Sequence, residues 1–168
     1  MKHRLSIVIF LVWLLGGCAT SSAPLARVEW VGTYSASGAE RVDAPWMGTG
    51  KFTHSLDPRL AEATTRIPAR LGTQYGVSYS FDGSAPSKTV LVEVIWRFPK
   101  ALIATRDADV RKDHESYRTE CPVDTSCLVG RVITERWETE PGPWVVEVWL
   151  AGPKTKVLEQ KFELVGDL

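Results

Sequence analysis

The densest group of titratable side chains lies in the segment 107–115. Carboxylate oxygens are the ligands that Ca²⁺ takes, but a calcium loop also needs a glycine at its turn, and this segment has none. Arg111 and Lys112 also stand among the acids and oppose a cation. We therefore expect a solvated charged loop with no bound metal, and metal binding there is the alternative. The groups concerned are four carboxylates and one imidazole: Asp107, Asp109, Asp113, His114 and Glu115.

Few other residues could support catalysis. The chain has no Gly-x-Ser-x-Gly elbow, no His-Glu-x-x-His pair and no glycine-rich phosphate loop. His54 follows Phe52 and Thr53 in a pattern typical of a strand with histidine on its polar face. The sequence predicts no catalytic residue and no cofactor. A hydrolase remains as an alternative only if residues distant in sequence form a pocket around His114 or a carboxylate pair.

Two tryptophans are candidates for ligand contacts. Trp46 lies in a stretch typical of a loop, and Trp149 falls on the same strand face as Glu147, away from the expected core. Tryptophan is enriched at interface hot spots and its ring can stack on sugars. Packing of Trp46 over one end of the core, and of Trp149 under a loop, is the favoured interpretation, and contact with a protein or glycan is the alternative.

The N-terminus predicts export and lipid anchoring. A short basic region, 2–4, precedes an almost unbroken apolar run of 11 residues, 5–15, which is typical of a signal peptide and too short to span a bilayer. The tetrad Leu15-Gly16-Gly17-Cys18 resembles the bacterial lipobox, in which the cysteine thiol carries a diacylglycerol. Ala19 stands where aspartate commonly signals inner-membrane retention. We expect an outer-membrane lipoprotein facing the periplasm.

These signals divide the chain into three parts. Residues 1–17 are the expected signal peptide, 18–26 the lipidated cysteine and a flexible tether, and 27–168 the folded domain. The 20 basic and 20 acidic side chains balance, so no basic surface is available to neutralise phosphates. A nucleic-acid partner is therefore not expected, and the acyl chains must hold the protein at the membrane.

Two cysteines remain for the domain, Cys121 and Cys127. In an oxidising compartment such a pair, with Pro122, Asp124 and Ser126 between, predicts a local structural disulfide. A redox pair would more often have two intervening residues, and a zinc site needs four ligands.

Alternating apolar and polar residues predict short strands along the domain. The clearest alternation places Val92, Val94 and Trp96 on one face and Glu93 and Arg97 on the other. Turn residues separate these segments, and no long amphipathic helix is evident. The sequence thus predicts an all-β fold, an antiparallel β-sandwich of immunoglobulin-like topology with seven or eight strands. The expected strands are 28–34, 51–56, 74–81, 88–98, 102–105, 129–138, 144–150 and 156–165.

Several short motifs resemble an uncharacterised bacterial family of small secreted domains, described as a domain of unknown function. The similarity covers roughly 28–165 and implies an envelope β-sandwich without catalytic residues, although the charged stretch 106–127 does not match. We therefore expect a lipid-anchored binding or assembly module whose partner is an envelope protein or a glycan. A glycan- or metal-binding accessory lipoprotein is the alternative. The motifs are 67–76 (IPARLGTQYG), 96–99 (WRFP), 141–144 (PGPW), 147–149 (EVW) and 159–162 (EQKF).

Overall fold

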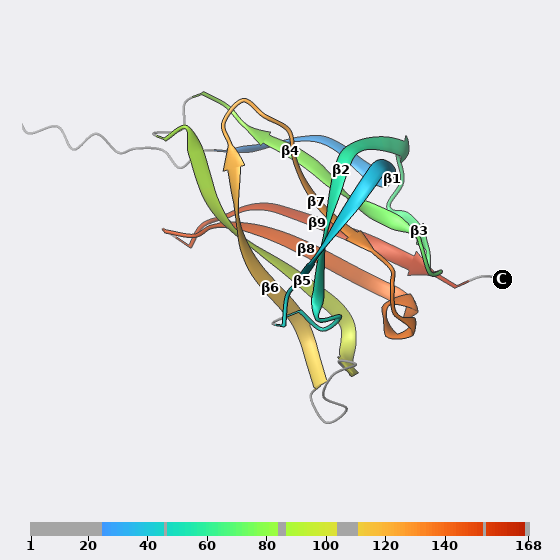
Figure 1. Ribbon diagram of the computed structural model, residues 1–168. Coiled ribbons are helices and arrows are strands. Elements are labelled where there is room, and N and C mark those ends of the chain that lie inside the picture. Colours follow the sequence, from blue (N-terminus) through green and yellow to red (C-terminus); the bar gives the residue numbers. More distant parts are fainter. Residues whose placement is uncertain (1–24, 46, 84–86, 104–110, 153, 167–168) are drawn as a thin grey trace, which may run out of the picture.

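A computed structural model describes residues 25–45, 47–83, 87–103, 111–152 and 154–166. In these residues nine strands form two sheets packed face to face (Figure 1). Sheet A has the order β2-β1-β4-β7 and sheet B the order β3-β9-β8-β5-β6. All pairings are antiparallel except that of β3 with β9. The strands are β1 (Ala26–Asp43), β2 (Lys51–Glu62), β3 (Arg66–Pro68), β4 (Gln74–Phe81), β5 (Thr89–Ile103), β6 (Arg111–Pro122), β7 (Cys127–Val132), β8 (Gly142–Leu150) and β9 (Lys156–Val165).

The β-sandwich expected from the sequence is confirmed, but the number of strands is not. The alternation predicted β4 and β9 with their observed bounds. The short β3 and the charged β6 were not predicted, and the expected strand 129–138 ends at Val132. A 3-10 turn, η1 (Arg136–Thr139), follows it, and no helix in the described part of the chain is long and apolar enough to cross a membrane.

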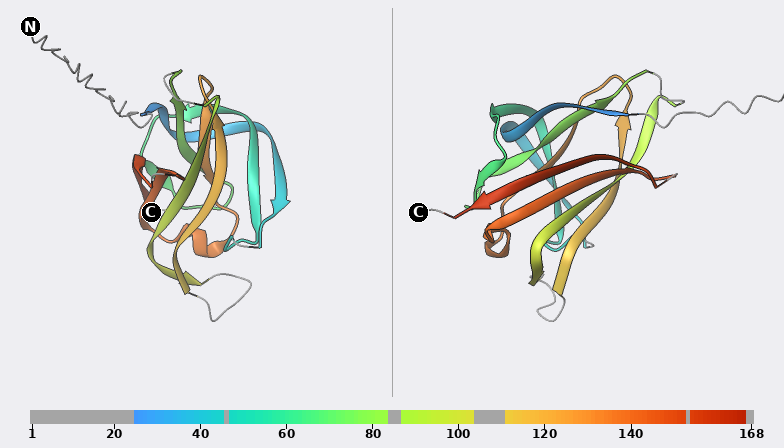
Figure 2. Two further views of the ribbon diagram at one scale, coloured as in Figure 1. Left: turned by 90° about the vertical axis from the view of Figure 1, so that its left-hand side faces the viewer. Right: turned by 180° about the vertical axis from the view of Figure 1, so that it is seen from behind.

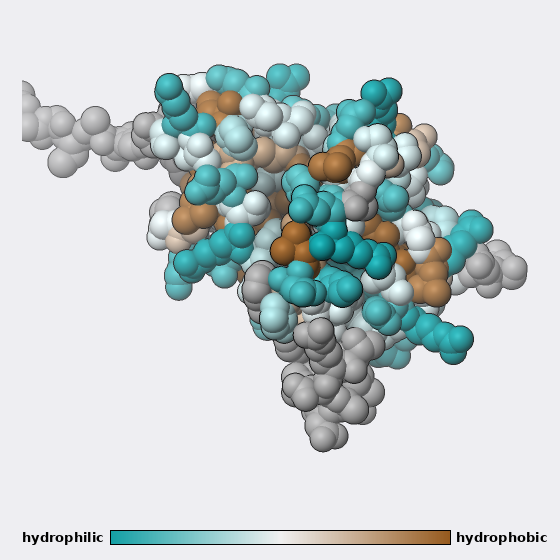
Figure 3. All heavy atoms as spheres, in the orientation of Figure 1, coloured by the Kyte–Doolittle hydropathy of each residue, from teal (hydrophilic) through white to brown (hydrophobic). Residues whose placement is uncertain are grey.

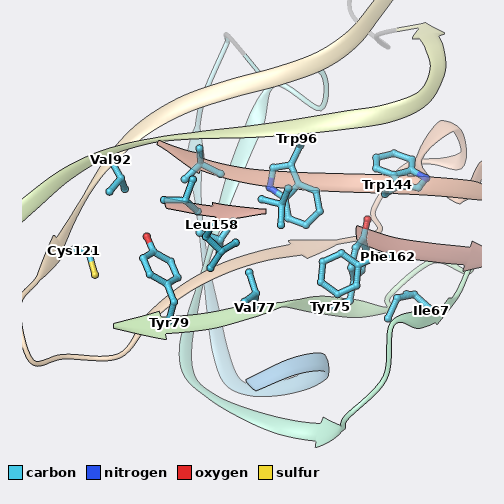
Figure 4. Close-up of a cluster of buried hydrophobic side chains, with 14 of the residues drawn as sticks. Ile67, Tyr75, Val77, Tyr79, Val92, Trp96, Cys121, Trp144, Leu158 and Phe162 are labelled. Carbon is cyan, nitrogen blue, oxygen red and sulfur yellow. The ribbon is translucent and has the colours of Figure 1, made fainter. Parts of the chain in front are cut away.

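Alternation along the strands builds the core between the sheets (Figure 4). Strand β4 contributes Tyr75, whose ring lies 5.7 Å from that of Trp96 on β5 and 5.1 Å from that of Phe162 on β9. Such edge-to-face pairs stabilise a core beyond the area that they bury. These contacts join the two sheets near their centre.

Strand β1 takes part in two pairings along its length. Ala26–Thr33 pairs with β4, whereas the rest of β1 pairs only with β2. Figure 2 shows this second half forming a hairpin with β2 at the side of the two sheets. The hairpin contacts both neighbouring edge strands. The Phe52 ring lies 5.1 Å from that of Tyr117 on β6, and Tyr34 packs so closely on Gly130 of β7 that a Cβ there would lie 2.5 Å from the Tyr34 hydroxyl.

The predicted disulfide is present. Cys121 lies near the end of β6 and Cys127 at the start of β7, with their Cα atoms 5.9 Å apart. Because β6 is an edge of sheet B and β7 an edge of sheet A, the bond fastens one sheet to the other across a short turn.

Replacing both cysteines, as Cys121→Ala with Cys127→Ala, should lower the free energy of unfolding by about 2 kcal/mol, because a closed loop of this length restricts the unfolded chain. Urea denaturation followed by tryptophan fluorescence measures the change. Reduced wild-type protein should show the same loss. Equal stability of the variant and the oxidised wild type would contradict a stabilising role for the bond.

Candidate functional site

One hollow in the described part of the chain is a groove bordered by β2, β6 and β7. Its volume is about 400 Å³, within the range of sites that bind small ligands. All three strands are edges of their sheets. In Figure 3 hydrophobic side chains appear at the middle of this face, with hydrophilic ones around them. Among the residues that line the groove are Tyr34, His54, Leu56, Tyr79, Tyr117, Thr119, Glu120 and Leu128.

The groove is bordered by a disulfide and by an aromatic pair, and its floor is neutral. Cys127 of the disulfide lines the groove, and so do Phe52 and Tyr117, whose rings are in contact. Burial raises the pKa of Tyr79 and of Tyr117, so both phenols are uncharged at neutral pH. His54 is exposed at the rim. The groove thus offers aromatic and hydroxyl groups, together with two exposed carboxylates, Asp57 and Glu120.

The position of the hairpin, and with it the shape of the groove, depends on a buried ionic cluster. Arg131 of β7 is 6% exposed, and it lies between Glu115 of β6 and Glu138 of η1. Its Nη1 donates to Glu115 over 3.1 Å and its Nε donates to Glu138 over 2.9 Å. Glu115 also accepts a hydrogen bond from the backbone N–H of Gly48, at the tip of the hairpin. One carboxylate therefore connects the hairpin to the core.

Aromatic rings enclose the guanidinium of Arg131. Its central carbon lies between 5.2 and 5.9 Å from the ring centroids of Trp96, Phe98, Trp137 and Trp144. Cations attract the faces of such rings, and the attraction is stronger where water is excluded. Burial alone would lower the pKa of Arg131, but the charges of Glu138 and Glu115 outweigh it and raise the pKa above its ordinary value. Arg131 is therefore a permanent cation.

Glu138 is positioned by the turn that carries it. Its carboxylate accepts hydrogen bonds from the backbone N–H groups of Thr134 and Glu135, over 2.7 and 2.9 Å, and from the Thr134 hydroxyl. These donors belong to the entry of η1, which a capping box closes. Each carboxylate of the cluster is held by Arg131 and by backbone N–H groups, so the cluster serves as a structural link.

Among the described residues that line the groove, histidine and hydroxyl side chains do not form a catalytic pair. His54 and Ser55 are neighbours on β2, so their side chains point to opposite faces of the strand. The Ser55 hydroxyl lies 3.1 Å from the hydroxyl of Tyr34, with which it shares a hydrogen bond. An activated nucleophile would instead need a hydrogen bond to a base.

The structure separates the residues of the acidic segment. Asp113 and His114 are exposed on β6, and the Nδ1 of His114 lies 2.6 Å from an oxygen of Asp113. That hydrogen bond is the main cause of the lowered pKa of Asp113. Glu115 instead points inward to Arg131. The expected loop is therefore wrong over 111–115, which belong to a strand, and the described residues contain no group of three or more side chains that could hold a metal.

Trp149, another predicted site residue, is not among the residues that line the groove. Trp149 is partly buried on the outer face of sheet B, where its Nε1 donates to Glu147 over 3.0 Å and Lys156 lies 5.6 Å from its ring. Glu147 also accepts hydrogen bonds from Arg97 over 3.2 and 3.3 Å. The predictions for Cys18, Trp46, Asp107 and Asp109 fall outside the described residues.

Sequence reasoning missed the ionic cluster, although one signal was present. Val129, Arg131 and Ile133 alternate on the buried side of their segment, so an arginine occupies a core position. A buried arginine requires carboxylate partners. The alternation alone does not identify those partners, because Glu115 lies 16 residues away in the chain.

Replacing the cation of the cluster, as Arg131→Met, should lower the free energy of unfolding by about 3–5 kcal/mol, because two buried carboxylates lose their partner. The exposed Arg118→Met is the matched control and should change stability by less than about 0.5 kcal/mol. Chemical denaturation measures the free energy of unfolding of both variants. Similar small losses in the two variants would contradict the role assigned to Arg131.

Acid should weaken the network of Glu147 on sheet B. Burial alone would raise the pKa of Glu147, but the hydrogen bonds from Arg97 and Trp149 outweigh it and hold the pKa below its ordinary value of 4.5. A carboxyl with a lowered pKa in the folded state contributes stability above its unfolded pKa and loses it as the pH falls further.

Stability measured from pH 6 to pH 3 should therefore fall more steeply for the wild type than for Glu147→Gln. Glu163→Gln removes a carboxylate whose surroundings lack this network, and it should retain the steep fall. Parallel curves for the wild type and Glu147→Gln would show that Glu147 does not contribute.

Comparisons with known proteins agree with this architecture. No curated protein is similar in sequence to the chain. An immunoglobulin-like protein from Pseudomonas aeruginosa is similar in structure, with a TM-score of 0.59 and 16% sequence identity over 83% of this chain and 96% of that one. The expected immunoglobulin-like fold is thereby confirmed. Residues 25–164 match the family described as a domain of unknown function, DUF3859, and the chain belongs to that family.

Proposed function

We propose that this protein is a lipid-anchored, non-catalytic binding module of the bacterial cell envelope, and that its ligand binds in the groove bordered by β2, β6 and β7. The observation that supports this proposal is the groove itself, a hollow of about 400 Å³ with an aromatic floor and a polar rim. Its lining combines apolar contact area with hydroxyl groups that orient a ligand, as in many binding sites.

The lipobox-like tetrad that ends at Cys18 supports anchoring. Strand β1 begins at Ala26, eight residues after Cys18. A fully extended segment of that length spans at most about 29 Å. A diacylglycerol on Cys18 would thus hold the domain close to the outer membrane, on its periplasmic side, where an envelope protein or a glycan is within reach.

A glycan-binding accessory lipoprotein is the second candidate function. It is favoured by the hydroxyl groups of Ser55 and Thr119 beside the rings of Phe52 and Tyr117, because sugars bind through hydrogen bonds and stacking on aromatic faces. A metal-binding role would use the acidic segment 107–115 and gains no support from the groove.

A photoreactive benzophenone amino acid in place of His54, which is exposed at the groove, should form one specific adduct in intact cells. The same amino acid in place of Lys161, exposed on β9, is the matched control and should form none. Cys18→Ser should abolish labelling with an alkyne fatty acid, release the protein from the membrane and weaken the adduct at position 54.

Failure to form an adduct at position 54, or equal adducts at positions 54 and 161, would contradict binding in the groove. Retention of the fatty-acid label in Cys18→Ser would contradict the anchor. The chemical nature of the adduct, protein or glycan, distinguishes the two candidate functions.

A further inference from the structure

We propose that the groove binds an extended peptide segment of a partner protein, which adds as a strand to an exposed sheet edge. The inference rests on the proposed binding function and names the class of ligand. Its basis is that three unpaired sheet edges border one hollow.

The backbone of these edges is available for pairing. Within the described residues β2 pairs only with β1, β6 only with β5, and β7 only with β4. Each strand therefore directs every second backbone N–H and C=O away from its sheet, with a repeat of about 6.7 Å. A peptide in the extended conformation has the same repeat of donors and acceptors. Sugars in a glycan do not present a matching backbone ladder.

Two of the three edges at the groove, β2 and β7, also lack the usual protection against pairing. Proteins commonly guard an exposed edge with charges, proline or a very short strand. Strand β3 has only three residues and ends in Pro68. By contrast, residues 52–56 of β2 and 127–130 of β7 contain no Lys, Arg, Asp, Glu or Pro. The unguarded edges thus coincide with the hollow, whereas β6 carries several charges.

The geometry of β2 limits the length of the ligand. Residues 52–58 all line the groove, which corresponds to about 23 Å of extended chain. Asp57 has a φ of 46° and Pro58 follows it, so regular pairing should end near Leu56. A bound segment of about five to seven residues fits this length.

The lining of the groove specifies the side chains of the ligand. Alternate residues of an added strand would face Tyr117 and Leu128, and these favour apolar side chains at every second position. Glu120 is exposed at the rim and has no ion pair among the described residues, which favours a Lys or Arg there. The expected ligand is a short, extended segment with alternating apolar residues and a basic residue.

The test uses the full chain in detergent as bait for a phage library that displays random twelve-residue peptides. We expect enriched peptides with alternating apolar residues. Synthetic copies should bind with micromolar affinity in a fluorescence anisotropy titration. Methylation of single backbone nitrogens should weaken binding at least tenfold at alternate positions only, because every second N–H pairs with the edge strand.

Two arginine substitutions on β6 test whether the peptide binds in the groove. Thr119→Arg introduces a long side chain at the groove and should weaken binding at least tenfold, whereas Ser116→Arg, exposed on the same strand and absent from the groove lining, should leave it unchanged. Circular dichroism confirms that both variants fold. No enriched peptide, a methylation effect without period two, or full binding by Thr119→Arg would overturn the inference. A glycan adduct at position 54 would overturn it as well and leave the binding function in place.

Discussion

The charge of Arg131 is the constraint on which the rest of this structure depends. A guanidinium inside a β-sandwich must be neutralised there, since water cannot solvate it. Glu115 and Glu138 supply the counter-charges from an edge strand of the opposite sheet and from η1, and four aromatic rings exclude water around them. Edge strand, turn and sheet A must therefore adopt one relative arrangement for the cation to be buried.

The same cluster determines where the hairpin lies. Glu115 accepts from Gly48 at the hairpin tip, and the Phe52 ring packs on Tyr117 a short distance along β6. The hairpin thereby covers one part of the gap between β6 and β7, and the disulfide closes the gap further along. The groove lies between the contact of Phe52 with Tyr117 and the disulfide. Side-chain packing therefore limits it on one side and a covalent bond limits it on the other.

Patterns formed by residues close together in the chain predicted most of the strands and the disulfide. Period-two alternation identified β4, β5, β8 and β9, and a six-residue separation was enough to predict the pairing of Cys121 with Cys127. Strand β6 was missed because its exposed edge carries charges that resemble those of a loop. The cluster and the groove were missed for a different reason. Both bring together residues that are far apart in the chain, and the spacing of residues along a sequence does not show which distant residues meet.

The separation of the Arg131 cluster from the groove has an evolutionary consequence. Residues that determine stability lie inside, sealed by aromatic rings, whereas Thr119, Glu120 and His54 stand at the rim and take no part in the cluster. Substitutions at the rim can change the surface of the groove with little cost in folding free energy. A domain built this way can diverge at its surface while it keeps a single scaffold, much as loops vary on other sandwich domains.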